Sequence, residues 1–177
     1  MNKLSDLIIR YAILLILGLN GLFMIYFLIS PITIYISFFA LNIISDATLS
    51  GNSIFFRGIQ INLIPACIAG SAYYLLLILN LTTPMDKKIR TKSLLFIIGL
   101  FFILNIFRII VFSILFSNNY SYFDFAHEST WYIGSTILIM VIWFANVKIF
   151  KINHIPIYSD MRLIYKESES KKIKSKK

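Results

Sequence analysis

Long apolar stretches alternate with short polar segments along most of the chain. A helix that crosses a membrane needs about 20 predominantly apolar residues, within a range of roughly 17–25. The stretches that approach or exceed this length are residues 7–29, 66–81, 93–116 and 130–150. The pattern therefore predicts an all-α integral membrane protein with about four transmembrane helices.

A fifth apolar segment, residues 32–44, follows Pro31 and is too short to span a membrane comfortably. We expect it to form a separate helix that lies in the membrane interface. Residues 53–66 mix β-branched and aromatic residues that partly alternate around Gly58, which predicts a short extended pair. The interfacial helix and the extended segment would both lie on the outer face, before the second span.

The composition supports the same class. Hydrophobic residues make up 58% of the 177 residues, against about 45–50% in a typical soluble domain. The single cysteine, Cys67, excludes an internal disulfide and a membrane oxidoreductase that works through paired cysteines. The first apolar run is longer than the roughly 7–15 residues of a signal-peptide core, which favours an uncleaved anchor. We expect one membrane-embedded domain, residues 1–152, and a basic cytoplasmic tail, residues 153–177.

The positive charges predict the orientation. With four spans, every Lys and Arg except Arg57 and Arg108 lies on one side of the membrane. Because cytoplasmic loops carry an excess of these residues, we expect a multi-pass protein of the cell membrane with both termini in the cytoplasm. A fifth span over residues 32–44 would place the N-terminal basic residues outside, so we reject it. The basic tail, which carries much of the net charge of +9, is then expected to be an orientation signal and a solvated extension that can also contact anionic lipid. No nucleic-acid partner is expected.

Cys67 lies at the start of the second span, on the outer side of the membrane in this topology. The unpaired amides and the dipole at the beginning of a helix favour a thiolate over a thiol. The alternative is that Cys67 is a small packing residue, as most unpaired cysteines are.

Arg108 lies within the third span, in the segment FFILNIFRIIVF. A charged side chain at the centre of a membrane helix costs about 2.5–3.5 kcal/mol on insertion scales, which makes an arginine there a functional candidate with a partner to be found. The alternative is that it extends outward to a lipid phosphate. Asn105 is one turn away on the same face and would help to build a polar pocket.

His127 precedes the fourth span on the outer side and can act as an acid or a base near neutral pH. The alternative is an interfacial histidine without a task. His154 lies on the cytoplasmic side, so the two histidines are not expected to share a metal. We interpret Asp124 and Glu128 as solvated loop acids. A thiolate with an acid–base group and a cation for a developing oxyanion provides the groups needed for acyl transfer.

At ACIAGS (66–71), NIFR (105–108) and AHE (126–128) the chain resembles the exosortase/archaeosortase family of membrane-embedded cysteine transpeptidases, in a short, archaeosortase-like form. The resemblance implies a catalytic triad of Cys67, Arg108 and His127. We expect no cofactor and no metal. It covers roughly residues 25–150. The sequence departs from the family around the cysteine, where an acidic residue before it and a Ser-Gly after it are common.

The resemblance also implies a function and its partners. Such enzymes recognise surface proteins that end in a short motif, a hydrophobic helix and a basic cluster. Their cysteine cleaves near the motif through a thioester, and a lipid amine or another envelope group then takes the protein. Two other functions remain open. The chain can be a non-enzymatic membrane scaffold in which Arg108 binds lipid phosphate, or a membrane acyltransferase that uses His127 on a lipid.

Overall fold

The computed structural model describes residues 3–162, 164 and 165. This part of the chain is mostly helical and contains one small sheet. The helices are α1 Lys3–Leu19, α2 Phe23–Ile44, α3 Pro65–Ile68, α4 Gly70–Leu81, α5 Lys87–Ser117, α6 Phe123–Ser129, the π-helix η1 Thr130–Gly134 and α7 Ser135–Phe150. The strands are β1 Ala47–Ser50, β2 Ser53–Phe56 and β3 Ile59–Asn62.

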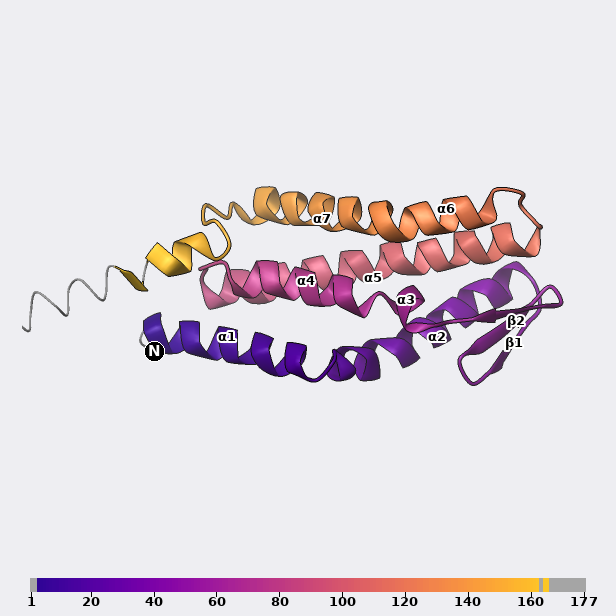
Figure 1. Ribbon diagram of the computed structural model, residues 1–177, viewed down its shortest axis with the longest axis horizontal. Helices are drawn as coiled ribbons and strands as arrows, with labels where there is room; N and C mark the ends of the chain where they lie inside the picture. Colours follow the sequence, from indigo (N-terminus) through magenta and orange to yellow (C-terminus); the bar gives the residue numbers. More distant parts are fainter. Residues whose placement is uncertain (1–2, 163, 166–177) are drawn as a thin grey trace, which may run out of the picture.

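The helices form an elongated bundle whose segments run back and forth along its length (Figure 1). Helices α1 and α2 follow one another in the same direction, and the sheet lies toward the end opposite the N-terminus. Within the described residues, three helices are long and apolar enough to cross a membrane: Phe23–Ile44, Lys87–Ser117 and the continuous Phe123–Phe150. The prediction of a largely helical protein with membrane-spanning helices is supported to this extent.

The first predicted span divides before Pro31. Gly21 and Leu22, with positive φ angles of 58° and 61°, separate α1 from α2, and glycine enters this region without steric cost. Helix α2 then continues through Pro31, so residues 32–44 form its second half and no separate interfacial helix. Proline removes one helical hydrogen bond. A break among apolar residues leaves more backbone groups unpaired, which is costly away from water.

The predicted extended segment is a three-stranded antiparallel sheet, in the order β1-β2-β3, within the described chain. Two-residue turns join the strands. Gly51, with φ of 58°, opens the first turn, and Arg57 and Gly58, with φ of 50° and 78°, form the second. Turns with positive φ match the twist of antiparallel strands. The pair predicted around Gly58 is confirmed, and β1 is an additional strand.

Two buried apolar clusters hold these elements together. The first lies among α2, α4, α5 and α7, where Tyr73 and Phe101 pack edge to face with ring centroids 4.7 Å apart. The second joins the sheet to α2 and α5 through Ile54, Phe56 and Ile109. The sheet is therefore fixed against the same helix that carries the arginine predicted to be functional.

A polar cluster connects three helices in the interior. Asn80 on α4 donates to Ser93 on α5 at 2.6 Å, and Ser93 donates to Asn146 on α7 at 2.8 Å. All three residues are fully buried. Hydrogen bonds between helices stabilise bundles in lipid, where no water competes for the polar groups. This cluster fixes how α4, α5 and α7 align along their axes.

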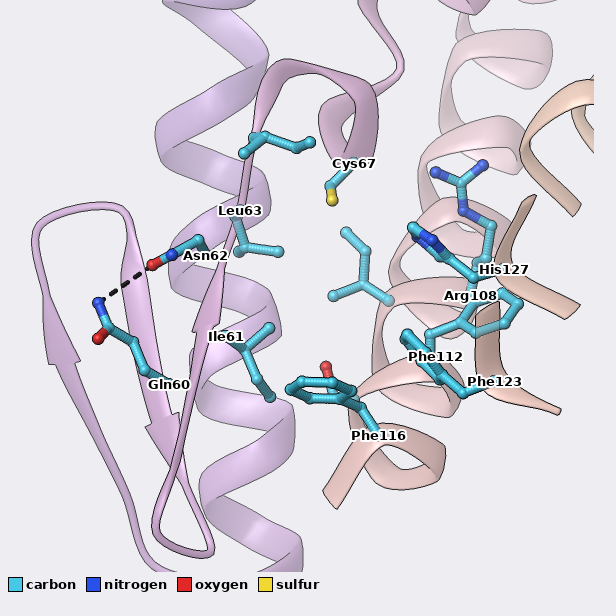
Figure 2. Close-up of a pocket in the computed structure, with 13 residues that line it drawn as sticks. Gln60, Ile61, Asn62, Leu63, Cys67, Arg108, Phe112, Phe116, Phe123 and His127 are labelled. Atoms are coloured by element: carbon cyan, nitrogen blue, oxygen red, sulfur yellow. Dashed lines mark hydrogen bonds between the residues drawn. The ribbon is translucent and has the colours of Figure 1, made fainter. Parts of the chain in front are cut away.

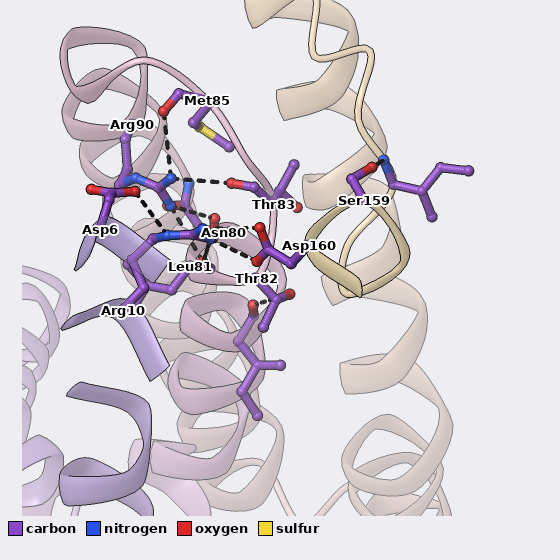
Figure 3. Close-up of polar contacts among 12 residues, drawn as sticks. Asp6, Arg10, Asn80, Leu81, Thr82, Thr83, Met85, Arg90, Ser159 and Asp160 are labelled. Carbon is purple, nitrogen blue, oxygen red and sulfur yellow. Dashed lines mark hydrogen bonds and ion pairs between the residues drawn. The ribbon is translucent and has the colours of Figure 1, made fainter. Parts of the chain in front are cut away.

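A buried ion pair closes the end of the bundle that carries the N-terminus (Figure 3). Arg10 donates to both carboxylate oxygens of Asp160 at 2.9 Å, and it also contacts Asp6 and the Leu81 carbonyl. Arg10 and Asp160 are 5% and 1% exposed. Asp160 belongs to the predicted basic tail, so this part of the tail is docked on the bundle instead of forming a solvated extension.

We expect Asp160→Ala to destabilise the fold by about 3 kcal/mol, because it leaves the buried Arg10 without its bidentate partner. Thermal unfolding of the purified protein in detergent measures the loss. Asp124→Ala removes an exposed carboxylate and serves as the matched control. Equal stability of the two variants would contradict the role of the ion pair.

Candidate active site

Cys67 lies in α3, a helix of a single turn. The helix begins at Pro65 and ends where Ala69 adopts a left-handed conformation with φ of 59°. The Cys67 N–H donates to the Ile64 carbonyl at 2.8 Å, and the residue is half-buried. The prediction that Cys67 lies in a first helical turn is confirmed. The macrodipole of a single helical turn is small, so the electrostatic environment of the thiol depends mainly on neighbouring elements.

Asn105 on α5 holds the cysteine-bearing turn in place. Its side-chain amide donates to the Cys67 carbonyl at 3.0 Å and lies 3.5 Å from the Ile68 carbonyl. Asn105 is 1% exposed. An amide donor in the interior satisfies carbonyls that the short helix leaves unpaired. Asn105 therefore positions the turn through main-chain hydrogen bonds. It is not among the residues that line the cavity described below, so the prediction that it helps to build a polar pocket is not supported.

Arg108 bridges the same turn to the last helix. One guanidinium nitrogen donates to the Ala66 carbonyl at 3.3 Å, and the other donates to the Ser135 hydroxyl at 3.1 Å. Ser135 in turn donates to the Thr130 carbonyl at 3.2 Å, across the π-helix η1. Single π-helical turns within α-helices are frequent at functional sites. The partners that the sequence predicted for Arg108 are thus groups of the protein itself.

His127 on α6 is held between aromatic rings. Its imidazole stacks on Phe123 with centroids 5.5 Å apart and meets Phe112 edge to face at 5.2 Å. No hydrogen bond to the ring is present among the described residues. Asp124 and Glu128 are exposed, in agreement with their interpretation as solvated acids. Both ring nitrogens therefore lack a hydrogen-bond partner within the part of the chain that the structure describes.

Cys67, Arg108 and His127 come from three separate segments and line one cavity of about 240 Å³. Figure 2 shows Cys67 above the cavity, with Arg108 and His127 on the side of α5 and α6. Most of the remaining wall is apolar and comes from residues 60–64, from α5 and from Phe123 on α6. The cavity thus combines a thiol, a cation and an acid–base group with space for an apolar segment.

Sequence reasoning missed Ser135 and Ser113. Ser135 receives a hydrogen bond from Arg108, and Ser113 is 3% exposed and lines the cavity. Ser113 lies five residues after Arg108, so helical spacing alone gives only a weak signal for it. Serines are common in membrane helices, and nothing in the sequence distinguishes Ser135 from its neighbours. The extended segment at residues 60–64 was predicted, but its place in the cavity wall was not.

Comparison with known proteins gives no match to a family model, a curated protein or a solved structure. The resemblance to exosortases and archaeosortases therefore stays a prediction that depends on the three motifs. The case for a function depends on what the side chains around the cavity can do.

Replacing Asn105 by alanine is expected to cost about 1–3 kcal/mol, because the Cys67 carbonyl loses its donor. The freed turn should also expose the thiol. We therefore expect both a lower melting temperature in detergent and faster reaction of Cys67 with a maleimide. Asn153→Ala, at an exposed position, is the control. Unchanged thiol reactivity in Asn105→Ala would show that this residue does not position the cysteine.

Proposed function

We propose that the chain is a protein-sorting cysteine transpeptidase of the exosortase/archaeosortase type. The observation that carries the proposal is the cavity shared by Cys67, Arg108 and His127. These are the residues that the motifs mark for nucleophilic, electrostatic and acid–base roles. A packing cysteine and a lipid-anchoring arginine have no reason to meet a histidine around one cavity, so the arrangement favours an enzyme over a scaffold.

In the proposed first step, His127 takes the thiol proton and the Cys67 sulfur attacks the carbonyl carbon of a peptide bond. The new C–S bond replaces the C–N bond, and His127 gives its proton to the departing amine. A guanidinium has five N–H donors, and Arg108 uses two of its nitrogens to bind Ala66 and Ser135. Its remaining N–H groups can donate to the developing oxyanion.

In the second step an acceptor nucleophile attacks the thioester carbonyl. His127 takes the proton of the acceptor, the C–S bond breaks, and Cys67 leaves as a thiolate that regains the proton from His127. An amine on a membrane lipid or another envelope group is the proposed acceptor. The product is a surface protein joined to that group, with its C-terminal segment released.

We propose four membrane crossings, formed by α1–α2, the segment Pro65–Leu81 with α3 and α4, α5, and α6–α7. The N-terminus and Asp160 lie at one end of the bundle, and the sheet lies toward the other (Figures 1 and 3). The basic residues near the first end make it cytoplasmic by the positive-inside rule. The cavity then opens toward the outer face, where surface proteins with a motif, a hydrophobic helix and a basic cluster present their cleavage site.

The order of steps predicts different failures for two variants in cells that express such a surface protein. Cys67→Ala should leave the substrate at full length without an adduct. His127→Ala should slow acylation by about 10²–10⁴, or let a thioester accumulate if its main task is activation of the acceptor. Gel mobility and release of the adduct by hydroxylamine distinguish these results. His154→Ala is the control, and cleavage by Cys67→Ala would reject the mechanism.

Arg108→Lys keeps the charge but should lower the rate of cleavage by about 10²–10³. An ammonium cannot bridge Ala66 and Ser135 and still present a planar pair of donors to a carbonyl oxygen. The rate of substrate shortening after induction measures the effect. Arg57→Lys, on the exposed hairpin turn, is the matched control. A lysine variant as active as this control would favour simple attraction to lipid phosphate.

A further inference from the structure

The third strand, β3, has a free edge. The sheet order is β1-β2-β3, and β3 pairs only with β2 among the described residues. The consecutive residues 60–64 all line the cavity that contains Cys67. Successive side chains of a strand point to opposite faces. A cavity that all five residues line therefore extends along the edge of the strand. Figure 2 shows the side chains of Ile61 and Leu63 on the side of Cys67, and those of Gln60 and Asn62 on the opposite side of the strand.

The register identifies the main-chain groups at this edge. Phe56 and Ile59 are paired across the two-residue turn, so in an antiparallel ladder Ile59 and Ile61 bond to β2. The Leu63 N–H donates to Asn52 O at 3.0 Å, which gives the same alternation.

Gln60 and Asn62 consequently direct their main-chain groups away from β2. The Asn62 carbonyl already accepts from the Ile64 N–H at 3.1 Å. The N–H groups of both residues and the Gln60 carbonyl have no hydrogen-bond partner in the described part of the chain. Their side chains bond to each other and to Ser53 and so do not cover the edge. Main-chain groups in this arrangement are a template for another strand.

We propose that an extended peptide segment adds to β3 as a fourth strand and is thereby led to Cys67. The inference rests on the proposed function, because it names how that site holds its substrate. Main-chain hydrogen bonds at Gln60 and Asn62 bind the peptide without regard to its sequence, and the apolar cavity wall selects its side chains. The chain continues from β3 through Ile64 into the turn of Cys67, so a peptide bound along the edge approaches the thiol.

The opposite edge of the same sheet offers a matched control. Ser50 and Ser53 flank the first turn, so Leu49 directs its N–H away from β2 by the same alternation. The Ala47 N–H, two residues earlier, donates to the Asn42 side chain at 3.1 Å, as this register requires. An edge strand tolerates proline where the N–H points outward. Gln60→Pro and Leu49→Pro therefore each block one edge without removing a bond to β2.

The first experiment measures binding without chemistry. The full chain with Cys67→Ser is mixed in detergent with a capped octapeptide of alternating Thr and Val, at about ten times its Kd. Amide exchange, followed by NMR, should slow about tenfold at Gln60 and Asn62. Ile59 and Ile61 are the internal reference. The same peptide with every main-chain nitrogen methylated should protect neither amide. Equal protection by both peptides would overturn the proposal, and so would the absence of protection with either peptide.

The second experiment compares the two proline variants. Gln60→Pro should abolish the protection of Asn62, whereas Leu49→Pro should retain it. Protection of Asn62 that survives in Gln60→Pro would contradict strand addition at β3. If this variant fails to fold, the comparison of the unmodified and the methylated peptide still tests the proposal. The assay contains no reactive thiol. A protein that binds the peptide but forms no thioester in cells would refute the proposed function alone, and the reverse result would refute strand addition alone.

Discussion

Two side chains of α5, one helical turn apart, bind the main chain of the turn that carries Cys67. Asn105 donates to the Cys67 carbonyl and Arg108 to the Ala66 carbonyl. The turn itself is one helical turn bounded by Ala69, and a helix of this length does not hold its own conformation in isolation. The position of the thiol therefore depends on α5, and a displacement of α5 would displace the thiol.

The rest of the structure keeps α5 in place. This helix packs against α2, α4, α6 and α7, and the buried Asn80, Ser93 and Asn146 cluster fixes its alignment with two of them. Arg108 adds a link to α7 through Ser135. His127 is different, because it is held by ring contacts alone within the described residues. Such contacts restrict its position but do not engage its ring nitrogens.

Much of this arrangement could be predicted from the sequence, because it depends on continuous stretches of residues or on the chemistry of single side chains. Apolar length located the helices, and the cost of burying a charge marked Arg108 as a residue that needs partners. The chemical types of Cys67, Arg108 and His127, and their expected positions on one side of the membrane, were the basis for predicting that they form one site. The prediction failed at Pro31, because a proline within an apolar helix removes one hydrogen bond, whereas a complete break would leave more backbone groups unpaired away from water.

Other features depend on contacts between distant segments, which no local pattern encodes. The pairing of Arg10 with Asp160 joins the two ends of the chain, although charge counting assigned the tail to solvent. Ser135 directly follows the π-helix η1, and its role depends on the hydrogen bond that it receives from Arg108 on another helix. The free edge of β3 follows from the order of the strands, which depends on the turns and on packing against α2 and α5.

The claim on which the account depends is that Cys67 and His127 face one cavity. His127→Cys gives a chain with two cysteines, since Cys67 is the natural one, and a short bis-maleimide reports whether they are neighbours. We predict rapid internal cross-linking in His127→Cys and little in Glu128→Cys, whose side chain is exposed on the next position of α6. Equal cross-linking of the two variants, or none in His127→Cys, would contradict the shared cavity and the mechanism built on it.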